Sequence, residues 1–113
     1  MTPTLFHNPK CSTSRKALEL LREHGVEPTV VEYLKTGWDR ETLMRLAERS
    51  GLGLAGLLRR REAEAVELAD TGASDDKIMN AMIARPVLVE RPIVETDKGA
   101  RIGRPVETIL DLI

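Results

Sequence analysis

The sequence predicts an α/β protein with a four-stranded mixed β-sheet and flanking helices. Three observations support this prediction. A strand–helix–strand pattern opens the chain, helical periodicity fills its middle, and short segments of period two precede a last helix. The 113 residues are 42% hydrophobic and 31% charged, which is a globular composition, and this length suits a single domain over residues 1–113.

The first part of the chain is predicted to form a βαβ unit. Residues 3–7 are expected to be a short strand that ends before Pro9, and residues 12–24 a helix that stops at Gly25. Residues 28–34, PTVVEYL, are rich in β-branched residues and predict a second strand. Two strands joined by a helix are most simply parallel, with a right-handed crossover.

A helical insert is predicted over about residues 39–84. Asp39 is placed to cap a helix that runs to about Ser50. The segments LAGLLRR and EAEAVELA have the pattern of short helices, and Ser74 can cap a further helix with the sequence DDKIMNAMIA.

The last part of the chain returns to the sheet. VLVE, residues 87–90, and PIVET, residues 92–96, are predicted strands, and Asp97-Lys98-Gly99 is a turn signal before ARIG, which indicates a hairpin. Pro105 suits the first turn of a closing helix. This order of strands and helices matches the thioredoxin-like plan.

Charge and composition exclude several classes of function. Lys and Arg number 17 against 18 Asp and Glu, and this balance gives no long-range attraction for nucleic acid. The chain has one Phe, one Tyr and one Trp, too few for base stacking. No apolar run is long enough to span a membrane, and no secretory signal is visible. A single cysteine excludes an internal disulfide and suits a reducing compartment, so we expect a cytoplasmic protein. From its charge and composition we expect no nucleic-acid or membrane partner.

The one cysteine, Cys11, lies where the first predicted helix begins, in FHNPKCSTSRKALELL. A thiol reacts as its thiolate, and unpaired N–H groups at a helix start stabilise an anion. A protonated His7, or arginines brought near by the fold, would add positive charge, and the hydroxyls of Ser12, Thr13 and Ser14 can donate hydrogen bonds to the sulfur. The same N–H groups can hold an oxyanion, so the segment predicts a nucleophile beside an anion pocket.

Plainer interpretations of these residues stay open. A lone cysteine is often a small buried apolar residue, and Ser12 or Ser14 can serve only as a helix cap. His7 with Cys11 is a weak metal signal without further ligands, so no metal site is predicted. Cys11 and Arg15 do not have the C-x5-R spacing of tyrosine phosphatases, and no second cysteine follows three residues on. Any redox cycle must therefore be completed by a thiol of another molecule.

The segment HNPKCSTSRKALELL closely resembles the active-site segment of the glutaredoxin-coupled arsenate reductases, the ArsC-like family. Further matches follow in the same order: EPTVVEYLKTG, LAGLLRRREAEAVEL, ARPVLVERPIVET and ARIGRPVETILDLI. The combination of HNPxCxxSR, ERPIV and IGRP is specific, and the resemblance extends from Thr4 to Ile113.

The resemblance implies a thioredoxin-like fold with a helical insert and an arsenate reductase activity. It implies that Cys11 is the nucleophile, that His7 lies near it and that Ser14 supports the thiolate. Arsenate would form a thiol adduct, glutathione would act as co-substrate and glutaredoxin would resolve the mixed disulfide, with no bound cofactor. Ser12 stands where relatives often have Gly, which narrows the expected pocket.

The resemblance also implies three anion-binding arginines, at Arg59, Arg91 and Arg104. Arg60 follows Arg59 directly, so the first assignment is open between the two. The Arg91-Pro92 bond falls at the cis-proline typical of the fold. The simpler alternative is that these arginines lie at a solvated helix end or in surface ion pairs.

Two rival functions remain beside arsenate reduction. The first is a glutathione-dependent thiol-disulfide reductase of the same family that has no arsenate activity. The second is a non-catalytic regulator of the Spx type, although those proteins typically carry a CxxC pair and this chain has Thr13-Ser14 at that place. A domain of this length with no exposed apolar stripe in its sequence is expected to be a monomer.

Overall fold

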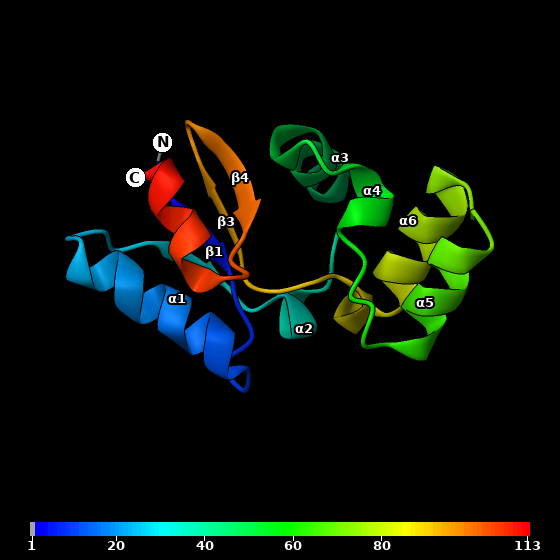
Figure 1. Ribbon diagram of the computed structural model, residues 1–113, viewed down its shortest axis with the longest axis horizontal. Coiled ribbons are helices and arrows are strands. Elements are labelled where there is room, and N and C mark those ends of the chain that lie inside the picture. Colours follow the sequence, from blue (N-terminus) through cyan, green and yellow to red (C-terminus); the bar gives the residue numbers. More distant parts are fainter. Residues whose placement is uncertain (1) are drawn as a thin grey trace. The chain divides into compact units, whose positions relative to one another are not determined.

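The computed structural model describes residues 2–113, which form two compact units (Figure 1). The sheet unit contains the residues up to Thr36 together with Arg91–Ile113. The helical unit is the continuous segment Gly37–Glu90, and the predicted helical insert falls within it.

The sheet unit is built on four short strands. These are β1 (Thr4–Phe6), β2 (Thr29–Val31), β3 (Ile93–Thr96) and β4 (Gly99–Ile102). Their order across the sheet is β2-β1-β3-β4; β1 and β2 are parallel, and the other two pairs are antiparallel. The mixed four-stranded sheet and the closing hairpin are thus confirmed.

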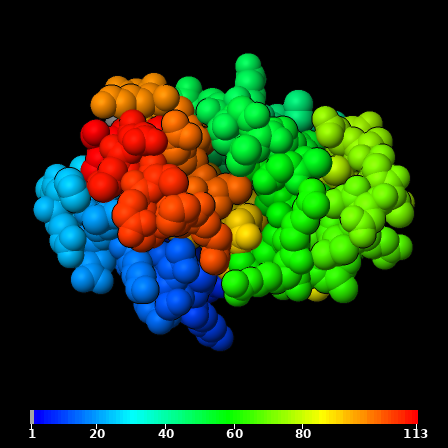
Figure 2. All heavy atoms as spheres, viewed as in Figure 1, coloured from blue at the N-terminus to red at the C-terminus, as the bar shows by residue number. Residues whose placement is uncertain are grey.

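Two helices cover one face of this sheet (Figure 1). Helix α1 (Ser12–Glu23) connects β1 to β2, and a 3-10 helix, η2 (Val106–Leu112), ends the chain. Leu5 and Val94 are paired neighbours in the sheet and meet these helices in the core. The buried members of the core are Leu5, Ala17, Leu21, Val94, Ile109 and Leu112. Figure 2 shows the C-terminal residues, in red, next to α1, in blue.

The second predicted strand ends earlier than expected. β2 stops at Val31 because its partner β1 is equally short and ends at the paired residue Phe6. The carbonyl of Glu32 accepts bonds from the amides of Lys35 and Thr36, and this closes a one-turn helix, α2 (Tyr33–Thr36), that the sequence pattern does not reveal.

Four helices make up most of the helical unit: α3 (Arg40–Ser50), α4 (Gly53–Gly56), α5 (Ala63–Asp70) and α6 (Asp75–Ala84). Both predicted caps are confirmed. The Asp39 side chain accepts a bond of 2.7 Å from the amide of Thr42, and Ser74 accepts one of 3.2 Å from the amide of Lys77. No helix in the described part of the chain has the length and apolar character needed to cross a bilayer.

The predicted strand VLVE is wrong. Residues Pro86–Leu88 form a 3-10 turn, η1, because Pro86 favours a helical start and the amide of Val89 bonds back to the Pro86 carbonyl. Only Val89 pairs in strand fashion, in an isolated antiparallel bridge with Leu58. The helix predicted for LAGLLRR is likewise short, since α4 ends at Gly56.

Candidate functional site

The thiol of Cys11 lies at the start of α1, where the sequence pattern places it. Cys11 is the N-cap residue, in an extended conformation, and its carbonyl accepts the first helical bond from the amide of Arg15 at 3.0 Å. The residue is partly exposed, so the sulfur is not sealed within the apolar core.

Two arginines from the other end of the sequence reach this thiol. The Arg104 Nη2 atom lies 3.5 Å from Cys11 Sγ, and the Arg91 side chain also interacts with the sulfur. Arg104 Nε donates a 2.7 Å hydrogen bond to the backbone carbonyl of Arg91, which ties the two segments together. The sheet unit therefore places two guanidinium groups beside one sulfur.

The β3–β4 hairpin explains how these arginines meet. Ile93 at the start of β3 pairs with Ile102 at the end of β4. Arg91 precedes this pair and Arg104 follows it, so both lie at the same end of the hairpin, opposite the turn. The Arg91-Pro92 bond is cis, as the resemblance implies, and the bond from Arg104 to its following proline is also cis, which no sequence pattern indicates.

The surroundings of Cys11 favour its thiolate. Burial by itself raises the pKa of the thiol, but four interactions outweigh it and bring the pKa of Cys11 below its ordinary value. These are, in decreasing order, the amide of Ser14, the side chain of Arg91, the amide of Thr13 and the positive charge of Arg104. The Cys11 side chain forms no regular capping bond, so the two amides act on the sulfur at the helix start without closing a cap.

His7 and Ser14 form a buried pair under the thiol loop. His7 Nδ1 lies 2.6 Å from Ser14 Oγ, and the amide of Asn8 donates to the same hydroxyl oxygen at 3.1 Å. The Ser14 hydroxyl therefore faces the loop, and its amide, not its hydroxyl, acts on the sulfur of Cys11. Burial keeps the pKa of His7 below its usual value, so His7 is neutral at pH 7 and the positive charge at the site comes from the arginines.

Arg59 lies in the helical unit, and its neighbour there is a carboxylate. Arg59 Nη1 bonds Glu90 Oε1 at 2.6 Å, with only 9% and 19% of the two side chains exposed. The backbone fixes this pair, since the amide of Arg59 bonds Leu88 O and that of Glu90 bonds Leu57 O. Within residues 2–113, Arg59 Nε has no hydrogen-bond partner. The role of Arg59 as a third anion-binding arginine stays a prediction.

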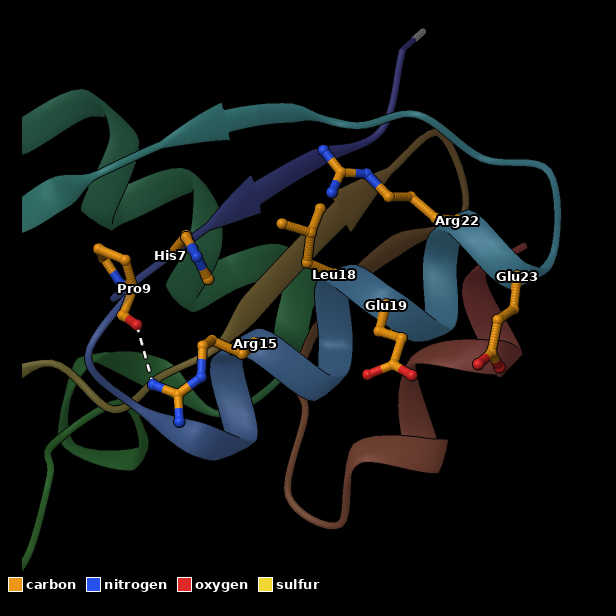
Figure 3. A pocket seen from close by; sticks show the side chains of 7 residues that line it. All are labelled: His7, Pro9, Arg15, Leu18, Glu19, Arg22 and Glu23. Atoms are coloured by element: carbon orange, nitrogen blue, oxygen red, sulfur yellow. Dashed lines mark hydrogen bonds between the residues drawn. The ribbon is translucent and has the colours of Figure 1, made fainter.

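A shallow groove of about 690 Å³ runs along the outer side of α1 (Figure 3). His7 and Pro9 stand at one end of it, and Leu18 lies between them and Arg22. Arg15 folds back so that its Nη1 donates to the Pro9 carbonyl at 2.9 Å. Arg15 thus stabilises the loop before the cysteine.

The grouping needed for a metal centre does not occur in residues 2–113. No three His, Cys, Asp or Glu side chains come together there as they would around a bound ion. The arrangement around Cys11 is instead suited to a nucleophile that reacts with an anionic partner, because a thiol with a lowered pKa lies beside two guanidinium groups.

Two positions that shape the site were not singled out from the sequence. Asn8 bonds the thiol loop at several points, and Gly103 lies against Pro92 beside Arg104. The Asn8-Pro9 dipeptide is a recognised turn signal and could have identified the first. The closeness of Gly103 to Pro92 depends on the hairpin register, which no local pattern shows.

Comparisons with known proteins show which family the chain resembles. The profile of the ArsC family matches residues 6–112. An arsenate reductase of Escherichia coli is 40% identical over 97% of this chain and 79% of its own length. The uncharacterized protein YfgD of Escherichia coli strain K12 is 44% identical over 96% of this chain and 94% of its own length.

The fold of this chain is also similar to solved structures of such proteins. An arsenate reductase from Vibrio cholerae has a TM-score of 0.92 and 40% identity, with coverage of 100% of this chain and 98% of that one. A putative ArsC family related protein from Bacteroides fragilis has a TM-score of 0.85 at 23% identity, which speaks for the fold alone. The chain belongs to the ArsC family and has its thioredoxin-like fold.

Proposed function

We propose that this protein is an arsenate reductase that uses glutathione and glutaredoxin. The observation that carries the proposal is the Cys11 thiol, which has a lowered pKa and lies 3.5 Å from the Arg104 guanidinium. Membership of the ArsC family and the 40% identity to arsenate reductases support the choice of arsenate among oxyanions.

The oxyanion binds between the start of α1 and the arginines. Arg91 and Arg104 donate charge-assisted hydrogen bonds to its oxygens, while the N–H groups at the helix start complete the pocket. Arg59 is the third arginine that the family resemblance implies. These donors stabilise the negative charge that builds up on the oxyanion as the thiolate attacks.

The reaction proceeds through a covalent adduct. The Cys11 thiolate attacks arsenic and forms a sulfur–arsenic bond, while one arsenate oxygen leaves as water after protonation. A glutathione thiolate then attacks the Cys11 sulfur. The sulfur–arsenic electron pair passes to arsenic, which leaves as arsenite in the +3 state, and a Cys11–glutathione disulfide remains.

Glutaredoxin completes the cycle. Its thiolate attacks the glutathione sulfur of the mixed disulfide and releases the Cys11 thiolate. The chain has one cysteine, so it cannot resolve this disulfide itself, which supports the need for external thiols. We expect the protein to act as a monomer in the cytoplasm, where glutathione is kept reduced.

A coupled assay tests the proposal. The protein is incubated with arsenate, glutathione, glutaredoxin, glutathione reductase and NADPH, and NADPH oxidation is followed. We expect oxidation that depends on arsenate and on every thiol component, and its loss in Cys11→Ser with an unchanged melting temperature. An unchanged rate in Cys11→Ser, or no dependence on arsenate in the wild type, would contradict the proposal.

A second candidate is a glutathione-dependent thiol-disulfide reductase without arsenate activity. One observation favours it: the Glu90 carboxylate already pairs with the Arg59 guanidinium at 2.6 Å, which leaves Arg59 less available to an oxyanion. A low-pKa thiol beside two arginines also suits a glutathione mixed disulfide, whose carboxylates arginines can bind. The same coupled system with a glutathionylated peptide in place of arsenate distinguishes the two functions.

A further inference from the structure

Asn8 lies in the loop between β1 and α1, three residues before the nucleophile. Its backbone carbonyl accepts a 3.0 Å bond from the amide of Cys11, which closes a turn around Pro9 and Lys10. Its side-chain Oδ1 accepts a second 3.0 Å bond from the amide of Lys10. The turn is therefore closed by both the backbone and the side chain of Asn8.

The same residue ties this turn to the first turn of the helix. The amide of Asn8 donates to Ser14 Oγ at 3.1 Å, and only 6% of Asn8 is exposed. Ser14 and Thr13 are the residues whose amides act on Cys11 Sγ. Asn8 thus bonds to two residues of the strand-to-helix turn. Its carbonyl accepts from the amide of Cys11, and its amide donates to the hydroxyl of Ser14.

We propose that Asn8 is a positioning residue for Cys11: its neutral side-chain oxygen holds the turn that presents the thiol to the α1 amides and to Arg104. Asn8 touches neither the substrate nor the sulfur in this role. The role in catalysis rests on the proposed function, since the alignment serves a nucleophile.

The chemistry of the position explains why asparagine suits it. The partner at Lys10 is an N–H donor, so the position needs an acceptor at the reach of an Asn or Asp side chain. Aspartate would supply that acceptor but would add a negative charge to a loop that carries a thiolate, and this opposes ionisation of the thiol. Alanine supplies no acceptor, and serine supplies a weaker one.

The test measures the thiol itself, apart from any turnover. Purified wild type, Asn8→Ala and Asn8→Ser are alkylated with iodoacetamide across a range of about pH 4 to about pH 10, because the rate reports the thiolate fraction. The ultraviolet absorbance of the thiolate gives an independent titration. The control is Asn80→Ala, which alters the other asparagine of the chain, an exposed residue of α6.

We expect the midpoint of the pH–rate profile to rise in Asn8→Ala, with alkylation at pH 6 about threefold or more slower than in wild type. Asn8→Ser should lie between the two, and Asn80→Ala should match wild type. A melting temperature is recorded for each variant, because a residue with only a structural role would lower this temperature and leave the midpoint in place.

An unchanged midpoint in folded Asn8→Ala would overturn the proposal, and so would equal shifts in the alanine and serine variants. If Asn8→Ala does not fold, the comparison of Asn8→Ser with wild type decides. A shifted midpoint in a protein that turns over no arsenate would refute the proposed function alone. Normal arsenate turnover with an unshifted midpoint in Asn8→Ala would refute the positioning role alone.

Discussion

At the scale of single residues, the reactivity of Cys11 depends on opposing effects on the pKa of its thiol. Partial burial disfavours the charged sulfur, while amides and guanidinium groups favour it, and the second set prevails. Arg104 has two tasks here, since its Nη2 faces Sγ and its Nε holds the Arg91 carbonyl. Loss of Arg104 therefore removes one charge and loosens the segment that carries another.

The first prediction at this scale concerns Arg104→Ala. Because the Arg104 charge lowers the pKa of Cys11, its removal should raise that pKa and reduce the thiolate fraction at every pH below the new midpoint. Iodoacetamide alkylation at pH 6 should slow by about threefold or more.

The matched control is Arg101→Ala. Arg101 is an exposed arginine of β4 whose guanidinium lies 3.6 Å from Asp111. Its removal should leave the alkylation profile of Cys11 in place. Equal profiles for Arg104→Ala and wild type would mean that the guanidinium at 3.5 Å contributes nothing to ionisation of the thiol.

At the scale of elements, the β3–β4 hairpin and the residues that flank it act as the support of the site. The amide of Gly103 bonds the Pro92 carbonyl at 2.8 Å, so the segments before β3 and after β4 stay together beyond the last strand pair. A Cβ on Gly103 would lie 3.0 Å from Pro92 Cγ and 3.2 Å from Ile109 Cγ2. This close approach is the physical reason for a glycine directly before Arg104.

Gly103→Ala should therefore disturb the site as well as the fold. The added methyl group must displace a proline ring or an η2 side chain, which costs about 1–3 kcal/mol of unfolding free energy. The displacement also moves Arg104 relative to the sulfur, so alkylation of Cys11 should slow. Chemical denaturation and the alkylation profile measure the two effects.

A second glycine, Gly51, provides a control that separates a loss of protein stability from a change in the reactivity of Cys11. Gly51 ends α3 in the helical unit with φ of +74° and open space around its Cα. Gly51→Ala should cost about 1 kcal/mol through backbone strain alone. If both variants lose stability and both keep the wild-type alkylation profile, the Gly103 segment has no part in placing Arg104.

At the scale of the whole molecule, the local charge at the site differs from the net charge. The protein carries a net charge of −1, yet the sulfur faces the side chains of Arg91 and Arg104. Long-range attraction of an anion is therefore weak, and its capture depends on the potential close to the site.

This contrast predicts how Cys11 discriminates between charged and neutral reagents. The ratio of the iodoacetate rate to the iodoacetamide rate should exceed the ratio for the same protein unfolded in denaturant, since the arginines attract the carboxylate. The excess should shrink as salt rises from about 10 mM to about 0.5 M, because screening shortens the reach of the charges. A ratio equal to that of the unfolded chain, independent of salt, would contradict a positive pocket.

Local signals account for what the sequence determined by itself. Asp39 and Ser74 predicted two helix starts, and the turn signal at Asp97-Lys98-Gly99 predicted the hairpin, because capping and turn formation depend on residues a few positions apart. The position of Cys11 at the start of α1 follows from the same kind of signal. The strand VLVE failed because an apolar run alone does not reveal whether a paired neighbour exists.

The tertiary structure alone decided which distant side chains lie beside the thiol. Arg91 and Arg104 are separated from Cys11 by most of the chain, and only the sheet register brings them to the sulfur. Burial, which no short sequence pattern shows, lowers the pKa of His7 and keeps this side chain neutral at pH 7. The positive charge near the sulfur therefore comes from the arginines. The sequence thus determined that a thiol stands at a helix start, where the amides of Thr13 and Ser14 lower its pKa, and the packing of distant segments added Arg91 and Arg104.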